Sequence, residues 1–106
     1  MAPIPRSVVY VCHPFRRDPA VNRRLVADEC RKLALSGYLP LAAQIYLPQF
    51  LDEDSERSFA LSLCLRLLSM ADEVRVYHQV SEGMRLEIAE AERLGIPVAY
   101  IRQPDP

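Results

Sequence analysis

Four short apolar runs, separated by longer segments with helical patterning, constrain this chain more than any other feature. The runs occupy residues 7–12, 38–43, 74–77 and 97–101. Short continuous runs rich in β-branched residues are typical of strands that a parallel sheet buries on both faces. Strands that alternate with helices through short connections predict a parallel sheet with helices packed on it. The order β-α-β-α-β-α-β therefore predicts an α/β fold, a small doubly wound sheet of the Rossmann or flavodoxin type.

The first helix has clear boundary signals. Asp18 is typical of an N-cap and Pro19 suits the first helical position, while Gly37 tolerates the left-handed conformation that often ends a helix. Between them, apolar residues recur at helical spacing. The predicted apolar face consists of Val21, Leu25, Ala27, Cys30 and Leu33.

The second and third helices follow the same logic. We expect Asp54 or Ser55 to cap the second helix, and Ser81 to cap the third, which Gly95 ends. Residues 44–52 contain a proline and predict a loop. The predicted apolar face of the second helix includes Phe59, Leu63, Leu67 and Met70.

Size and charge limit the classes of function. A chain of 106 residues predicts one domain, residues 1–106. With 13 Lys and Arg against 14 Asp and Glu, the formal net charge of −1 favours neither a nucleic-acid polymer nor an anionic membrane as partner. No run reaches the roughly 20 apolar residues of a membrane span. The proline-rich residues 102–106 predict a loose tail.

The cysteines and histidines predict neither a metal centre nor a cofactor. Cys12, Cys30 and Cys64 lie in apolar stretches, and no two have a metal-ligand spacing such as C-x-x-C. Buried, reduced thiols are the expected state, which fits a cytoplasmic protein. His13 and His78 each follow a strand and have no helical His partner.

The segment that opens the third helix is the first candidate site. A helix N-terminus presents free N–H groups and the positive end of the helix dipole, so it suits an anion. Ser81 adds a hydroxyl, and Gly83 lets a ligand approach the backbone closely. Glu87 lies under two turns further on and could face the same cleft. Alternatively, Ser81 only caps the helix and Glu87 is a solvated helix residue.

The loop after the first strand is the second candidate site. It consists of His13, Pro14, Phe15, Arg16 and Arg17. Two arginines beside a helix N-terminus can bind phosphate, or they can pair at the surface with Asp18 and other acids. Asp72, at the end of the second helix, is expected to orient the turn before the third strand.

The ordered motifs point to a known family. They run from Val-Tyr-Val-Cys-His-Pro-Phe at 9–15, through Ala-Asp-Glu-Val-Arg-Val at 71–76, to Ser-Glu-Gly-Met-Arg-Leu-Glu-Ile at 81–88. Gly-Ile-Pro-Val at 95–98 closes the set. From Val8 to about Tyr100 the chain resembles the nucleoside 2-deoxyribosyltransferase-like superfamily. It is especially similar to a small branch whose hallmark is S-x-G-M-x-x-E-I.

The resemblance implies a reaction at an N-glycosidic bond, with Glu87 as the nucleophile. Glu87 would attack C1′ of the sugar and displace the base, and the glycosyl ester would pass to water or to another base. A carboxylate suits this chemistry because the transition state is positively charged. Tyr10 matches the strand tyrosine that helps to position the glutamate.

The resemblance also bears on the substrate. Transferases acting on free nucleosides carry an aspartate six residues before the nucleophile, whereas nucleoside 5′-monophosphate N-glycosidases carry a serine. Ser81 holds this position, and Arg16 matches an arginine of the phosphate loop, which favours a nucleotide over a nucleoside. The residues expected to bind the substrate and its phosphate are Ser81, Gly83, Met84, His13, Pro14, Phe15 and Arg16.

Departures from the family pattern leave other classes of function open. Cys64 stands where characterised members carry an aspartate that protonates the leaving base, and an ordinary thiol does not do this at neutral pH. His13 and Pro14 stand where many relatives have glycine. The sequence ends at Pro106, whereas characterised members continue and a neighbouring subunit's tail completes the site. The alternatives are a non-catalytic nucleotide-binding or sensing module of the same fold, and a purely structural or interaction domain.

A homodimer or higher homo-oligomer is also implied, because related domains pair through their second and third helices. Leu61, Leu65 and Leu68 supply apolar surface beyond the face assigned to the core, and surplus apolar surface favours self-association. The same leucines could instead be buried within one chain.

Overall fold

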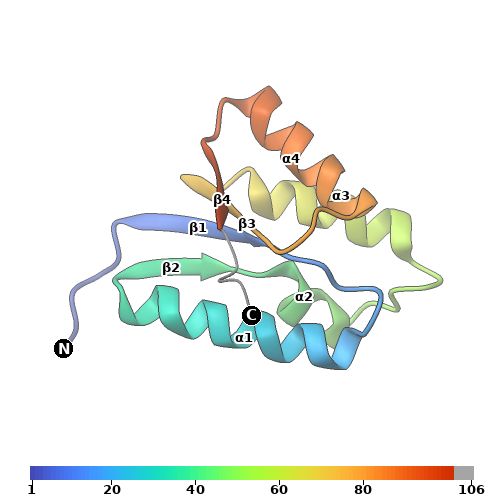
Figure 1. Ribbon diagram of the computed structural model, residues 1–106, viewed down its shortest axis with the longest axis horizontal. Coiled ribbons are helices and arrows are strands. Elements are labelled where there is room, and N and C mark those ends of the chain that lie inside the picture. The colour runs from blue at the N-terminus through green and yellow to red at the C-terminus, as the bar shows by residue number, and fades with distance from the viewer. Residues whose placement is uncertain (102–106) are drawn as a thin grey trace.

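The computed structural model describes residues 1–101 and contains one four-stranded parallel sheet (Figure 1). Its strands are β1 (Ser7–Cys12), β2 (Tyr38–Leu41), β3 (Glu73–Tyr77) and β4 (Val98–Ile101), in the spatial order β2-β1-β3-β4. All three strand pairs are parallel. The predicted α/β class and the doubly wound parallel sheet are confirmed. The tail predicted at 102–106 lies outside the described residues.

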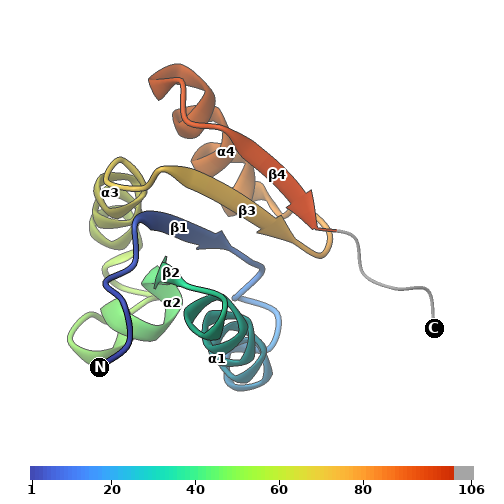
Figure 2. The ribbon, with the colours of Figure 1, turned by 90° about the vertical axis from the view of Figure 1, so that its left-hand side faces the viewer.

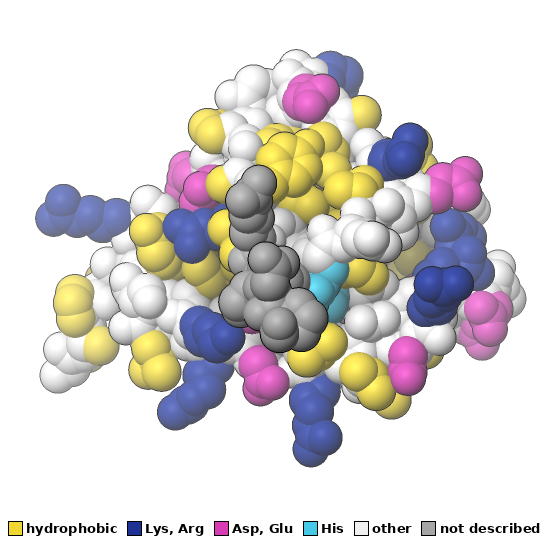
Figure 3. Space-filling model, in the orientation of Figure 1, with side chains coloured by type: hydrophobic (Ala, Val, Ile, Leu, Met, Phe, Trp, Pro, Cys, Tyr) yellow, Lys and Arg dark blue, Asp and Glu magenta, His cyan; other side chains and the backbone are white. Residues whose placement is uncertain are grey.

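Three long helices cover the sheet on both faces (Figure 2). Helix α1 (Pro19–Leu35) lies on one face, and α3 (Arg57–Leu68) and α4 (Glu82–Leu94) lie on the other. None of the helices in residues 1–101 is long and apolar enough to cross a membrane. On the face shown in Figure 3, basic and acidic side chains are interspersed.

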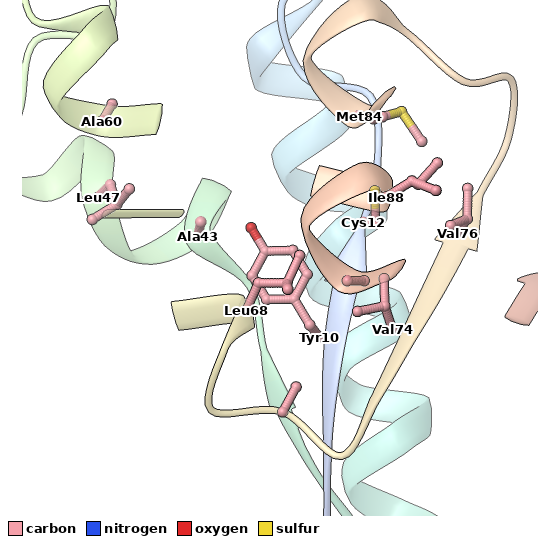
Figure 4. Packing of buried hydrophobic residues seen from close by; sticks show 12 residues of the cluster. Tyr10, Cys12, Ala43, Leu47, Ala60, Leu68, Val74, Val76, Met84 and Ile88 are labelled. Carbon is pink, nitrogen blue, oxygen red and sulfur yellow. The ribbon is translucent and has the colours of Figure 1, made fainter. Parts of the chain in front are cut away.

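The core is divided by the sheet, because successive residues of a strand point to opposite faces. Val9 and Val11 of β1 pack on the α1 side. Tyr10 and Cys12 pack on the other side, together with Val74 of β3 and with residues of α3 and α4 (Figure 4). The continuous apolar run that predicted a strand buried on both faces is explained by this division.

The predicted helix ends are largely confirmed. Asp18 caps α1 by accepting a hydrogen bond from the Val21 N–H at 3.4 Å. Ser81 caps α4 in the same way, and Gly95 ends it in the left-handed region at φ 73°. The second long helix begins later than predicted, with Glu56 rather than Asp54 or Ser55 as its N-cap. Gly37, at φ 93°, follows the end of α1.

The predicted loop at 44–52 is wrong over residues 44–49. Residues Ala43–Tyr46 form the short helix α2, and Leu47–Gln49 form a 3-10 turn, η1. Ala43 and Leu47 are buried in the core, so tertiary packing stabilises helical turns too short to be stable alone.

The two predicted helix faces are right only in part, since Leu33 of α1 is buried and Leu63 and Leu67 of α3 pack against the core, whereas other members are exposed. Phe59 and Met70 are 65% and 52% exposed, and the buried residues of α3 are Ala60 and Leu68. Since Leu68 is fully buried, it supplies no surface for self-association. In α1, Val21 and Leu25 are exposed, whereas Val26 and Leu33 are the buried residues.

Candidate functional site

The carboxyl ends of β1 and β3 open into a cavity of about 800 Å³. The two strands are neighbours and parallel, so the loops that follow them emerge at the same edge of the sheet. Ten of the eleven candidate site residues named from the sequence line this one cavity. They are Tyr10, His13, Pro14, Phe15, Arg16, Arg17, Ser81, Gly83, Met84 and Glu87.

The remaining candidate, Asp72, does not line the cavity. Its carboxylate Oδ2 accepts a hydrogen bond from the Val8 N–H at 2.8 Å, and its own N–H donates to the Val8 carbonyl at 2.8 Å. Asp72 thus ties the turn before β3 to the start of β1.

Glu87 is the buried carboxylate of the cavity. It lies on the inner face of α4, is 9% exposed, and its Oε2 has no hydrogen-bond partner within residues 1–101. Burial raises the pKa of Glu87 from 4.5 to about 7, because the charged form loses its hydration. The nearby Tyr10 hydroxyl opposes this shift. The alternative of a solvated helix residue is therefore wrong.

Tyr10 and Cys64 lie beside Glu87 on the same side of the sheet. Tyr10 is fully buried, and burial followed by the charge of Glu87 raises the pKa of its hydroxyl. The Tyr10 oxygen lacks a hydrogen-bond partner in the described chain. Burial, together with Glu87, raises the pKa of the Cys64 thiol to about 12, so this side chain stays protonated at neutral pH. All three cysteines are free.

The N-terminus of α4 forms another wall. Ser81 Oγ accepts a hydrogen bond from the Met84 N–H at 3.4 Å, and the Ser81 N–H points to Met84 Sδ at 3.4 Å. Around Gly83, no neighbouring heavy atom lies within 4 Å of where a Cβ would stand. This space permits a ligand to approach the backbone there.

Three arginines also line the cavity. Arg16 is exposed, and its guanidinium lies 4.0 Å from the Asp54 carboxylate, the limit for an ion pair. Arg17 and Arg57 also line the cavity. Asn22 holds the loop after β1, because its Nδ2 donates to the Phe15 carbonyl at 3.1 Å. Arg57 was missed from the sequence, since a lone arginine at a helix start carries no signal.

Gln44 is another lining residue that could not be recognised from the sequence. It lies in α2, is 8% exposed, and its Nε2 donates to the His13 carbonyl at 2.8 Å. His13 is 2% exposed, and its Nδ1 lies 2.8 Å from the Pro14 carbonyl. A glutamine inside a segment predicted to be a loop gives no pattern from which its burial could be recognised.

Four buried side-chain atoms in the described chain have no hydrogen-bond partner, and all four belong to residues that line this cavity. They are Tyr10 OH, His13 Nε2, Gln44 Oε1 and Glu87 Oε2. Each such group costs about 1–3 kcal/mol when left unpaired. Their concentration in one hollow is the pattern of a polar ligand site. Residues 1–101 contain no group of three or more side chains suited to hold a metal ion.

Comparisons with known proteins agree with this fold. A family model described as a domain of unknown function (DUF7768) matches residues 7–101. The chain is also similar to the solved structure of a 2-deoxyribosyltransferase from the psychrotolerant bacterium Bacillus psychrosaccharolyticus. The TM-score is 0.69 at 18% identity, over 89% of this chain and 71% of the other. No curated protein matches the chain.

Proposed function

We propose that this chain, which belongs to the DUF7768 family, cleaves or transfers the N-glycosidic bond of a nucleoside 5′-monophosphate or nucleoside, with Glu87 as the nucleophile. The fold it shares with a 2-deoxyribosyltransferase supports this class of reaction. So does the resemblance of its ordered motifs to that superfamily.

The observation that carries the proposal is the environment of Glu87. An unpaired buried carboxylate destabilises a fold, and such groups concentrate at functional sites. Glu87 lines the cavity, is buried, and has an unpartnered oxygen. A pKa of about 7 leaves about half of the molecules with a carboxylate nucleophile at neutral pH.

The proposed reaction has two steps. A carboxylate oxygen of Glu87 bonds to C1′ of the sugar as the bond from C1′ to the base nitrogen breaks, and the base leaves with the bonding electron pair and takes up a proton from solvent. Water or a second base then attacks C1′ and gives up a proton to solvent, and the bond from C1′ to the Glu87 oxygen breaks to release the carboxylate. Tyr10 acts as a positioning residue, because its hydroxyl lowers the pKa of Glu87 and so favours the reactive form.

The cavity lining also contains groups suited to a phosphate on the substrate. Arg16, Arg17 and Arg57 bring positive charge, and the α4 N-terminus at Ser81 adds the positive end of a helix dipole. An aspartate in place of Ser81 would repel a phosphate. We therefore favour a monophosphate over a free nucleoside.

The test is release of free base from a panel of ribo- and deoxyribonucleoside 5′-monophosphates, followed by chromatography. Glu87→Gln keeps the size of the side chain but removes the nucleophile, so release should fall to background. Glu92→Gln, at an exposed position of the same helix, is the matched control and should keep wild-type release. Equal release by wild type and Glu87→Gln would contradict the proposed nucleophile.

The second candidate function is a nucleotide-binding or sensing module without turnover. Cys64 favours it, because a thiol with a pKa of about 12 does not protonate a departing base at neutral pH. Isothermal titration with the same panel separates the two functions. Binding without base release supports the sensor, and binding with release supports the enzyme.

A homodimer is a further part of the proposal. Leu68 is buried, but Phe59 of α3 and Leu86 and Leu94 of α4 are exposed. Exposed apolar side chains on two neighbouring helices suit an interface between copies of this chain. Light scattering coupled to gel filtration should give twice the chain mass, and a monomer mass would exclude this expectation.

A further inference from the structure

His13 lines the cavity, and its ring carries a buried hydrogen-bond acceptor. A carbonyl oxygen only accepts, so the contact of 2.8 Å to the Pro14 carbonyl requires the proton on Nδ1. Burial lowers the pKa of His13 below its usual 6.5, which keeps the ring neutral. Nε2 is then left with a lone pair and no proton. It is buried and has no partner among the described residues.

Gln44 offers a second acceptor, and its orientation is fixed in the same way. Its Nε2 donates to the His13 carbonyl at 2.8 Å, so the NH2 end of the amide faces His13. The other end, Oε1, is a buried acceptor without a partner in residues 1–101. One residue, His13, therefore carries the first acceptor on its side chain and orients the second through its backbone.

We propose that His13 Nε2 and Gln44 Oε1 form an acceptor-only subsite that binds the exocyclic amino group of a nucleobase. The cavity then selects adenine or cytosine over hypoxanthine or uracil. This inference rests on the proposed nucleotide site and names the class of base that the site takes.

The chemistry of the two groups explains the selection. An exocyclic amino group has two N–H donors, one for each acceptor. The oxo group of hypoxanthine or uracil has only lone pairs. Both protein acceptors therefore stay unpaired, and the oxo oxygen becomes a third acceptor without a donor. Leaving a buried polar group unpaired weakens binding by roughly ten- to hundredfold relative to the paired ligand.

The ring contacts favour a fixed rather than a mobile acceptor. The His78 ring meets the His13 ring edge-on at 4.6 Å between centroids, and the Tyr77 ring lies at 6.2 Å. A side chain held in this way loses little conformational entropy when a ligand binds, which favours discrimination between bases.

Isothermal titration with matched pairs, CMP against UMP and AMP against IMP, tests the inference without any need for turnover. We expect the amino member of each pair to bind at least about tenfold more tightly. His13→Phe keeps a ring of similar size but no acceptor, and Gln44→Met keeps the length of the side chain; each should reduce the ratio toward one. Gln49→Met is the matched control, because Gln49 bonds to the Ile45 carbonyl outside the cavity lining and its loss should leave the ratio unchanged.

Free adenine, hypoxanthine, cytosine and uracil form a second arm that separates this inference from the proposed function. Equal binding within each nucleotide pair, or a preference that survives both His13→Phe and Gln44→Met, overturns the acceptor subsite alone. If no nucleotide binds but free adenine and cytosine still bind better than their oxo counterparts, the nucleotide site fails and the subsite stands. If the free bases show no preference either, both fail.

Discussion

The buried carboxylate of Glu87 destabilises the folded chain at neutral pH. Its pKa is about 7 when folded against 4.5 ordinarily, so the folded chain binds this proton more tightly. The free energy of unfolding therefore contains a favourable contribution from protonated Glu87 that is fully present below pH 4.5 and is lost as the pH rises through 7. Glutamine cannot ionise. Glu87→Gln should therefore be more stable than wild type at pH 8, by about 3 kcal/mol, and similar near pH 4.

Urea denaturation of both proteins at the two pH values measures this difference. Glu92→Gln removes a carboxylate from an exposed position of the same helix and should change the free energy of unfolding by the same small amount at both. Equal stabilities of wild type and Glu87→Gln at pH 8 would mean that the carboxylate is not desolvated as the structure indicates.

The same titration sets the pH dependence of catalysis. The carboxylate is the nucleophile, so kcat/KM for base release should rise with pH through about 7. At pH 5 it should be about a hundredfold lower than when Glu87 is fully ionised. The Tyr10 hydroxyl lowers the pKa of Glu87, so Tyr10→Phe should move the midpoint to higher pH. A pH–rate profile of each protein checks this. A rate that is flat between pH 5 and 8 would contradict Glu87 as the titrating group.

At the scale of the element, Gly83 within α4 and Gly95 just after its end should respond in opposite ways to a methyl group. Gly95 ends the helix at φ 73°, where alanine is strained, so Gly95→Ala should cost about 1 kcal/mol. Gly83 is helical with open space around it, so Gly83→Ala should leave stability unchanged or raise it by up to about 1 kcal/mol. If a ligand approaches the Gly83 backbone, its affinity should fall nonetheless. Urea denaturation and titration with a nucleotide separate these effects, and unchanged affinity would exclude close approach at Gly83.

The elements predicted correctly are those with local signals. Asp18 and Ser81 were recognisable as caps because side-chain capping depends on neighbours within three residues. The short helix α2 was not predictable, because Ala43 and the following η1 residue Leu47 are held by the core rather than by their own sequence. Phe59 was misplaced because α3 is apolar on more than one side, so spacing alone does not decide which side is buried.

The site, too, could be predicted only where its residues carry a local signal in the sequence. The motifs on β1 and α4 were visible because both follow strands, and the parallel sheet brings their ends together. Gln44 was invisible because its role depends on a hydrogen bond to His13, 31 positions away. The spacing of residues in the sequence also did not determine whether Glu87 faces solvent or the cavity. Only the packing of α4 on the sheet determines this.

At the scale of the whole molecule, charges of both signs line the cavity. The formal net charge is −1, and Arg16, Arg17 and Arg57 line the cavity together with the acidic residues Asp18, Glu53, Glu82 and Glu87. Arg57 stands at the first position of α3, where a cation meets the positive end of the helix dipole. That position does not favour stability, so Arg57→Gln should not destabilise the fold.

Arg57→Gln should instead weaken binding of a nucleoside 5′-monophosphate about three- to tenfold and leave the free nucleoside nearly unaffected, because only the phosphate carries the charge that the arginine attracts. Raising the ionic strength should reduce the wild-type preference for the monophosphate, since salt screens exposed charges. Arg31→Gln, on the exposed surface of α1 and outside the cavity lining, is the matched control. Titration of both ligands at two salt concentrations provides the measurement. A wild-type preference that salt and Arg57→Gln both leave unchanged would mean that these arginines do not bind the phosphate, and the choice between nucleotide and nucleoside would then lie with Ser81 and the α4 N-terminus.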